Sequence, residues 1–201
     1  MSALTRIIPW SHNLVAEVLQ PGDTAVDLTA GRGRDTMVLA LAVGMTGRVV
    51  AFDVQRTALD MAARTLRAAG FPVTDWTLGA DVPTTPGIYL VHACHSALAA
   101  FVTTPIRAVI ANLGHLPDGD PALVTRPETT CRCLQGTLDL LLPGGRLVVT
   151  ISPGHPDAAA EAAAVTRLLS ALPHEQWNVL RLSVANVDAA PYLLMAERLG
   201  R

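Results

Sequence analysis

The sequence contains no lysine: its fifteen basic residues are all arginine, against seventeen acidic residues and a formal net charge of −2. Charged residues make up only 16% of the chain, so no global positive charge is present to attract nucleic acid. Because alanine is abundant, we attribute the exclusive use of arginine to a bias of the coding sequence and not to RNA binding. This balance is still compatible with a local arginine patch.

Cysteine is also scarce. Cys94, Cys131 and Cys133 are odd in number and lack the C-x-x-C spacing, which argues against structural disulfides and zinc and predicts a reduced, cytoplasmic protein. Residues Met1 to Pro9 hold one arginine and no long apolar core, which argues against a signal peptide. No uncharged apolar run is long enough to cross a bilayer, so we expect no membrane association.

Half of the 201 residues are hydrophobic, and strand-like and helical patterns alternate along the chain without repeats or linkers. The patterns predict one domain, residues 1–201, of the α/β class, with a mostly parallel seven-stranded sheet, an antiparallel edge strand and helices on both faces. Residues 73–78 are either a further strand or an extended connection. The expected strands are 25–28, 48–52, 88–92, 106–112, 146–151, 177–184 and 191–198. The expected helices are 11–19 with Ser11 as its N-cap, 35–43, 56–69, 97–102, 128–142 and 157–172.

Residues 24–36 (TAVDLTAGRGRDT) are the motif around which the rest of the chain is organised. The apolar run 25–28 predicts a short buried strand, the glycines predict a tight turn, and an apolar helical pattern begins at Met37. A strand, a glycine turn and a helix N-terminus form the nucleotide site of a doubly wound sheet, because unpaired backbone N–H groups there can bind a ligand. We therefore expect a nucleotide-type cofactor at this turn.

The acidic residues around this turn distinguish between cofactors. A dinucleotide site has the pattern G-x-G-x-x-G, and here Thr36 stands in place of the third glycine. Asp27, inside the strand, would repel a phosphate but suits the ammonium group of a methionine moiety. Asp53 ends the next strand about 20 residues past the turn, where a carboxylate grips ribose hydroxyls. These features favour S-adenosylmethionine over NAD; the alternative is that the glycines only form a turn and Asp53 only caps a helix.

Four expected strands end in polar or glycine-containing segments, at 27–35, 53–55, 92–96 and 112–120. Ligands of open α/β sheets bind beyond the carboxyl ends of the strands. In the last segment (NLGHLPDGD), Asn112, a neighbouring carbonyl and the ring of His115 can hold an amine and direct its lone pair at a methyl group. The alternative is a capped strand end before a loop without function, although long loops in compact domains are more often functional.

The histidines do not form a metal motif. His92 lies in an apolar strand and is interpreted as a core residue, whereas His12 lies on a helix face and is either a surface residue or part of a lid over the cofactor. No ligand motif frames His92, His95 and His115. We expect no metal.

Three motifs carry a resemblance to a known family: residues 27–36 (DLTAGRGRDT), residues 52–55 (FDVQ), and residues 112–120 followed by Glu128-Thr129-Thr130. They are similar to those of the small bacterial "putative rRNA methylase" family of class I S-adenosylmethionine-dependent methyltransferases. The resemblance also takes in residues 154–156 (GHP) and the region 186–191, so it covers nearly the whole chain. It implies the Rossmann-like class I methyltransferase fold.

Members of this family act on tRNA, where they methylate the aminomethyl nitrogen of 5-aminomethyl-2-thiouridine at the wobble position. The resemblance thus implies this activity, S-adenosylmethionine as cofactor and the anticodon region of tRNA as partner. It implies catalytic roles for Asn112, His115 and Asp120 and contacts to the substrate from Leu113, Gly114, Leu116, Arg126, Glu128 and Thr129. It implies cofactor contacts from Asp27, Thr29, Ala30, Gly31, Gly33, Asp35, Thr36, Asp53, Val54, Gln55, Cys94, His95 and Ser96.

The chain departs from the family pattern in both ligand segments. His115, Asp118 and Pro121 stand where the family has Tyr, Gly and Lys, and Arg32 and Arg34 replace Asn and His. Without the Tyr ring, stacking on a base depends on the His115 ring, and without the Lys one phosphate contact is lost. If tRNA binds, a basic surface should flank the loop, and its nearest candidates in sequence are Arg32, Arg34, Arg126 and Arg132.

Two other functions are also compatible with the sequence. The same class of enzyme could act on rRNA or on a small-molecule amine, or the chain could be a catalytically idle cofactor-binding module that works through protein contacts. The Asn112 segment argues against the idle module, while the departures at His115 and Pro121 keep it open. A homodimer is compatible with the resemblance, but no stretch of the sequence displays an interface.

Overall fold

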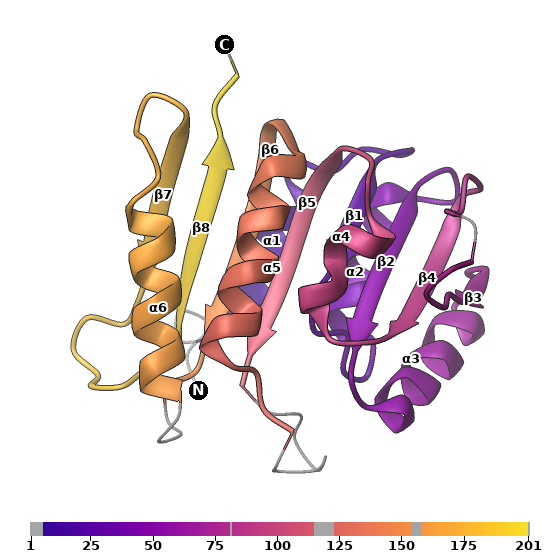
Figure 1. The fold of residues 1–201 in the computed structure, drawn as a ribbon, viewed down its shortest axis with the longest axis horizontal. Helices are drawn as coiled ribbons and strands as arrows, with labels where there is room; N and C mark the ends of the chain where they lie inside the picture. Colours follow the sequence, from indigo (N-terminus) through magenta and orange to yellow (C-terminus); the bar gives the residue numbers. More distant parts are fainter. Residues whose placement is uncertain (1–5, 81, 115–122, 154–157, 201) are drawn as a thin grey trace.

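The computed structural model describes residues 6–80, 82–114, 123–153 and 158–200 of the chain. In these ranges, eight strands form one sheet in the order β3-β4-β2-β1-β5-β6-β8-β7 (Figure 1). The strands from β3 to β6 pair in parallel, whereas β8 is antiparallel to both β6 and β7. Their bounds are β1 Thr24–Asp27, β2 Arg48–Asp53, β3 Val73–Asp75, β4 Gly87–His92, β5 Ile106–Leu113, β6 Leu141–Ile151, β7 Trp177–Leu182 and β8 Tyr192–Arg198.

Helices cover both faces of the sheet, with α5 and α6 in front of the strands and α1 and α2 behind them in Figure 1. Successive residues of β1 enter the two layers in turn: Val26 packs in the core cluster that includes Leu134 of α5, and Ala25 in the cluster that includes Leu39 of α2. The helices are α1 Ile7–Ala16, α2 Arg34–Val43, α3 Arg56–Ala68, the 3₁₀ helix η2 His95–Ala97, α4 Leu98–Phe101, α5 Pro127–Leu140 and α6 Ala158–Ser170.

The expected α/β sheet with an antiparallel edge is confirmed, with differences at three elements. β6 begins at Leu141, so the expected continuation of the helix 128–142 to its end is wrong. The sheet has one strand more than the seven expected, because the short β3 pairs in parallel with β4 at the edge. The first helix begins at Ile7, so the expected N-cap at Ser11 is wrong: Ser11 is buried within α1 and its hydroxyl donates to the Ile8 carbonyl (2.7 Å). Pro9 is tolerated in the first turn, where backbone N–H groups have no partner within the helix.

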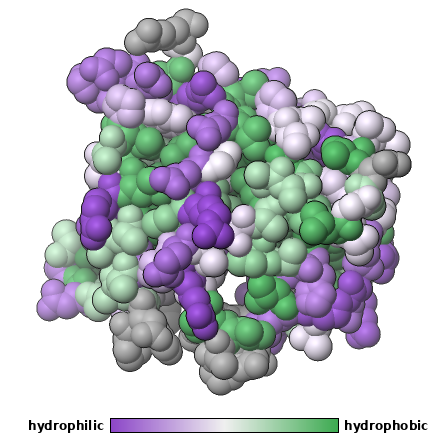
Figure 2. All heavy atoms as spheres, in the orientation of Figure 1, coloured by the Kyte–Doolittle hydropathy of each residue, from purple (hydrophilic) through white to green (hydrophobic). Residues whose placement is uncertain are grey.

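The outer face of α5 is polar. Glu128, Arg132, Gln135 and Asp139 are exposed at helical spacing, and Figure 2 shows hydrophilic side chains along this side of the molecule. No helix among the described residues is both long and apolar enough to span a membrane.

The order in which strands are added to the sheet reverses between β1 and β5, although the two strands are parallel. β1 pairs with β2 on one side and with β5 on the other, with Ala25 opposite both Val49 and Ala108. The connections that leave β1 and β5 therefore run in opposite directions and leave a crevice at the carboxyl ends of the two strands. Open α/β sheets bind ligands in such a crevice. The two motifs that follow β1 and β5 therefore lie next to each other.

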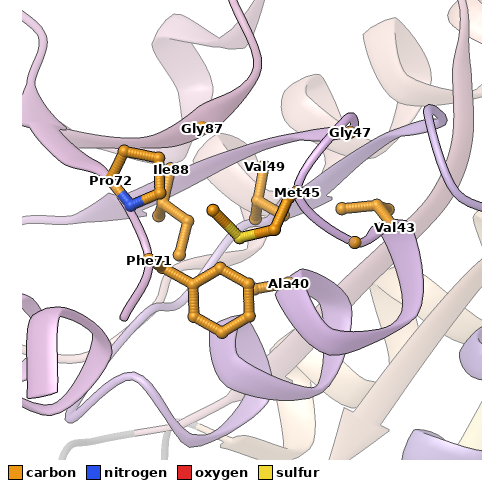
Figure 3. Close-up of a pocket in the computed structure, with 10 residues that line it drawn as sticks. Ala40, Val43, Met45, Gly47, Val49, Phe71, Pro72, Gly87 and Ile88 are labelled. Carbon is orange, nitrogen blue, oxygen red and sulfur yellow. The ribbon is translucent and has the colours of Figure 1, made fainter. Parts of the chain in front are cut away.

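A small apolar cavity lies elsewhere, near the amino ends of β2 and β4 (Figure 3). Its volume of about 10 Å³ is no larger than a water molecule needs, and its walls include Val43, Phe71 and Ile88 but no polar side chain. It is a packing gap between α2 and the sheet and holds no candidate site.

Candidate functional site

A cleft of about 760 Å³ opens at the carboxyl ends of β1, β2, β4, β5 and β6. This volume is in the range of small-molecule and cofactor sites. The described residues that line it are Ile7, Ile8, Leu28, Thr29, Ala30, Gly31, Arg32, Arg34, Asp35, Phe52, Asp53, Val54, Gln55, Ala93, Cys94, His95, Asn112, Leu113, Gly114, Leu123, Val124, Thr125, Thr129, Thr150, Ser152 and Pro191.

The turn after β1 is organised by the buried carboxyl group of Asp27. One of its oxygens accepts the N–H of Thr29 (3.0 Å) and the other accepts the hydroxyl of Thr36 (2.6 Å), so it ties the strand end to the start of α2. Burial, together with the charge of the neighbouring Asp35, raises the pKa of Asp27 to about 7, although the two hydrogen bonds act in the opposite direction. Asp27 does not line the cleft, so its carboxyl group shapes the turn from behind.

Gly33 allows the turn to pass close to α3. Its backbone is left-handed (φ +81°), and a Cβ at this position would lie 2.9 Å from the Cβ of Ala62. Any side chain would therefore be strained by the backbone and would also clash with α3.

Asp35 is the acid of the first motif that faces the cleft. Its carboxylate lies 2.6 Å from Nε2 of His12 on α1. This contact joins α1 to the start of α2. Ile7 and Ile8 of α1 line the cleft wall. His12 thus lies next to the turn after β1 but does not line the cleft, and its role in a lid over the cofactor stays a prediction.

Asp53 lies at the end of β2 with its carboxylate facing the turn. Its two oxygens accept the N–H groups of Gly31 and Gln55, both at 2.8 Å. Each carboxylate oxygen has two lone pairs, so both can accept a further hydrogen bond from a ligand hydroxyl. The apolar side chains of Phe52 and Val54 flank this carboxylate in the cleft wall.

The segment after β4 places Cys94 and His95 in the cleft wall but not Ser96, whose hydroxyl donates to the Cys94 sulfur (3.2 Å). His95 is buried, and desolvation lowers its pKa, while a hydrogen bond to the backbone of Leu28 acts in the opposite direction. We therefore expect a neutral His95 ring at neutral pH.

Asn112 lies at the end of β5 with its side chain exposed to the cleft. Its backbone N–H donates to the hydroxyl oxygen of Thr29 (2.7 Å). This bond links residues 112–114, here called the acceptor segment, directly to the turn after β1 (residues 28–33), here called the cofactor turn. On the other side, Asn112 is opposite Thr150 of β6. Thr150 also lines the cleft, and its buried hydroxyl has no hydrogen-bond partner among the described residues.

The backbone after Asn112 is held by a buried network. Gly114 donates its N–H to the Thr125 hydroxyl (3.0 Å) and accepts the Thr125 N–H at its carbonyl (3.1 Å). The hydroxyls of Thr125 and Thr130 both donate to Glu161 of α6, at 2.6 Å each. The hydroxyl oxygen of Thr130 also lies 3.3 Å from Nε2 of His95, so the network extends to another residue that lines the cleft.

The donor set of the cleft fits S-adenosylmethionine. A carboxylate with spare lone pairs suits ribose hydroxyls, apolar walls suit an adenine ring, and the acidic, glycine-bearing turn suits an ammonium-bearing chain. Arg32 and Arg34 lie at this same cleft, but Asp35 and Asp53 keep the turn itself acidic. The set therefore suits a methionine moiety better than the pyrophosphate of a dinucleotide.

The structure brings together thirteen of the site residues expected from the sequence. Asp27, Gly33, Thr36, Ser96, Arg126 and Glu128 are close in sequence to this set but do not line the cleft. His115, Leu116 and Asp120 lie outside the described residues. The thirteen that line the cleft are Thr29, Ala30, Gly31, Asp35, Asp53, Val54, Gln55, Cys94, His95, Asn112, Leu113, Gly114 and Thr129.

Several lining residues were not expected. Thr150 and Ser152 end or follow a predicted strand, so the rule that ligands bind at carboxyl ends could have indicated them. Ile7, Thr125 and Pro191 carry no such signal, because only the packing of remote segments brings them to the cleft. Among the described residues, no group of three His, Cys, Asp or Glu side chains could hold a metal ion.

Comparison with known proteins identifies the family of the chain. A family model described as "Putative rRNA methylase" matches residues 49–197. The chain belongs to this methylase family. A chloroplastic tRNA (mnm(5)s(2)U34)-methyltransferase of Arabidopsis thaliana is 31% identical over 191 residues, which cover 92% of this chain; the chain spans 66% of that protein's length.

Solved structures of similar proteins have the same fold. A "putative rRNA-methylase" from Clostridium thermocellum superposes with a TM-score of 0.85 at 30% identity, covering 96% of this chain and 97% of the other. A "putative methyltransferase" from Streptococcus mutans, solved in complex with SAH, gives a TM-score of 0.79 at 29% identity and covers 96% and 98%. The expected fold, enzyme class and cofactor are thus confirmed at the level of the methylase family: class I methyltransferases that use S-adenosylmethionine.

Proposed function

We propose that this protein methylates the amine of 5-aminomethyl-2-thiouridine at the wobble position of tRNA. The observation that carries the proposal is the place of Asn112: its side chain faces the cleft, and its backbone is bonded to Thr29 of the cofactor turn. A polar side chain so close to this turn suits an acceptor that needs orientation by hydrogen bonds. The printed name of the plant relative, which specifies mnm(5)s(2)U34, supports the choice of acceptor.

The cofactor end of the cleft divides into three parts in this proposal. Asp53 accepts hydrogen bonds from the ribose hydroxyls, with Gln55 beside it, and Cys94 and His95 border the adenine. The turn from Thr29 to Gly31, together with Asp35, holds the methionine end. When bound, S-adenosylmethionine supplies a methyl group on a positively charged sulfur, which an amine lone pair displaces in line.

Asn112 orients the acceptor amine. Its side-chain oxygen accepts one N–H of the amine, and this bond turns the nitrogen lone pair toward the methyl group. The new bond forms between nitrogen and the methyl carbon, the carbon–sulfur bond breaks, and the sulfur keeps the electron pair. An alkylammonium has no lone pair, so one proton must leave the amine first, to solvent, His115 or Asp120.

The tRNA contact is proposed to lie around the mouth of the cleft. Arg34 is exposed and lines the cleft, and Arg126 is exposed next to the lining residue Thr125. Arg32 and Arg132 are the other members of this arginine surface. Since the net charge is −2, local arginines must supply any phosphate attraction.

The decisive experiment measures transfer of a labelled methyl group from S-adenosylmethionine to tRNA that carries 5-aminomethyl-2-thiouridine. We expect product with the wild-type protein and a loss of roughly a hundredfold or more in kcat with Asn112→Ala, because the amine is no longer oriented. The Asn112→Ala variant should still bind S-adenosylhomocysteine with wild-type affinity.

The matched control substrate is the same tRNA with an unmodified wobble uridine, which lacks the amine. Methylation of that tRNA, or of rRNA in place of tRNA, would overturn the acceptor assignment. Absence of product on all RNAs, with intact cofactor binding, would favour a small-molecule amine or an idle cofactor-binding module.

A further inference from the structure

Glu161 is a buried carboxylate outside the cleft that the proposed chemistry does not use. It lies on α6 with 4% of its surface exposed, in a stretch that is otherwise rich in alanine. Burying a carboxylate is unfavourable unless hydrogen bonds compensate it. Here two hydroxyls do so, from Thr125 and Thr130, each at 2.6 Å.

The Thr125 arm of this arrangement ends at the acceptor segment. A carboxylate can only accept hydrogen bonds, so it fixes the hydroxyl hydrogen of Thr125 toward α6. The hydroxyl oxygen is then free to accept the N–H of Gly114 (3.0 Å). On the other side of the same segment, Thr29 accepts the N–H of Asn112 (2.7 Å).

Residues 112–114 are therefore held by one threonine hydroxyl at each end. The Thr29 hydroxyl belongs to the cofactor turn, whereas the Thr125 hydroxyl is oriented by Glu161. Asn112 can hold an acceptor at a fixed distance from the cofactor only if both ends of this short segment stay in place.

We propose that Glu161 is a positioning residue for methyl transfer, which acts through Thr125 and Gly114 to fix the segment that carries Asn112. The proposal rests on the proposed function of Asn112 as the group that orients the acceptor amine. It assigns to α6, an element without a residue in the described cleft wall, a direct part in the geometry of the reaction.

The test compares kcat per folded molecule in Glu161→Gln, Glu161→Ala and Thr125→Val, with S-adenosylhomocysteine binding measured on each variant. Gln keeps the shape but donates to one threonine, so we expect a loss of roughly fivefold, equivalent to about one net hydrogen bond. Ala removes the carboxylate, and a small misplacement of the acceptor should cost roughly a hundredfold. The amide hydrogen of Gly114 should exchange faster in Glu161→Ala and Thr125→Val than in the wild type.

Thr137→Val is the control, because Thr137 is, like Thr130, a buried threonine of α5 but is not one of the two threonines that bond to Glu161. This variant should change neither kcat nor Gly114 exchange. A purely structural Glu161 would lower the melting temperature and leave kcat per folded molecule unchanged, which would overturn the proposal. If Glu161→Ala does not fold, kcat per folded molecule in Glu161→Gln and Thr125→Val tests the proposal in its place.

If the proposed function itself is wrong, the experiment gives a different result. In that case the wild-type protein is inactive on the aminomethyl tRNA, and Gly114 exchange becomes the readout. Wild-type exchange in Thr125→Val and Glu161→Ala would then overturn the positioning role as well, whereas faster exchange in both, with no change in Thr137→Val, would support it.

Discussion

At the scale of single residues, the acids of the cofactor turn divide into two kinds. Asp27 is fully buried and bonds to Thr29 and Thr36, while Asp35 and Asp53 line the cleft. Asp27 was expected at the cofactor because of its place in the motif. Its contacts instead make it the group that shapes the turn, and Asp35 is the acid next to it that can meet an ammonium group.

The raised pKa of Asp27 predicts a pH-dependent stability. Its pKa in the folded state is about 7, above the ordinary value of 3.8, so the folded protein holds a proton that the unfolded chain releases. This stabilisation is complete below about pH 4 and is lost as the pH rises to about 7. Relative to Asp27→Asn, the free energy of unfolding of the wild type should fall by on the order of 4 kcal/mol over that range, measured by urea unfolding.

An exposed aspartate provides the control for this comparison. Asp139→Asn on α5 changes the charge by the same amount but should leave the pH dependence of the wild type in place. A wild type and an Asp27→Asn variant with parallel stability curves from pH 4 to 7 would show that Asp27 is ionised throughout.

At the scale of elements, the site depends on how closely the turn after β1 approaches α3. Gly33 has a left-handed backbone and lies where a Cβ would contact Ala62. Gly70, after α3, has a similar φ of +88° but open space around its missing Cβ. The two glycines separate the cost of backbone strain from the cost of a steric clash.

We expect Gly33→Ala to lower the free energy of unfolding by about 2–3 kcal/mol and Gly70→Ala by about 1 kcal/mol, since a left-handed alanine costs about 1–2 kcal/mol before any clash. Gly33→Ala should also weaken S-adenosylhomocysteine binding, because the turn must move away from α3. Calorimetric titration and thermal unfolding of both variants measure these effects. Equal destabilisation by the two substitutions would show that the clash of a Cβ at position 33 with Ala62 adds nothing to the cost of backbone strain.

At the scale of the whole molecule, function depends on where the charges lie and not on their sum. The net charge of −2 offers no general attraction for RNA. Arg34 and Arg126 are exposed at or beside the cleft, so the proposed substrate would meet a local positive surface there.

The double variant Arg34→Ala/Arg126→Ala should therefore weaken tRNA binding and reduce its dependence on salt. If each arginine contacts a phosphate, the slope of log affinity against log salt should fall by about 0.7–0.9 for each residue removed. Fluorescence anisotropy over a salt series measures this slope. Arg64→Ala, an exposed arginine of α3 that does not line the cleft, is the control; an unchanged slope in the double variant would exclude this surface.

The sequence by itself determined the framework of the site. Short apolar runs, glycine turns and helical periodicity are local signals, and they placed the cofactor turn, Asp53 and Asn112 at the ends of parallel strands. Because the carboxyl ends of such strands meet at one edge, the strand pattern alone predicts that these residues lie together. Local signals failed at Ser11, where tertiary packing of Ile7 extends the first helix past its apparent cap.

Only the tertiary structure decided which polar groups face the cleft and which support it from behind. Asp27 and Asp35 are eight positions apart in one motif, yet Asp27 is fully buried behind the turn and Asp35 lines the cleft wall. Glu161 has no motif at all and reaches Thr125 and Thr130 because α6 packs beside α5. Burial and hydrogen bonding depend on segments that are remote in sequence, and no local pattern encodes their distance.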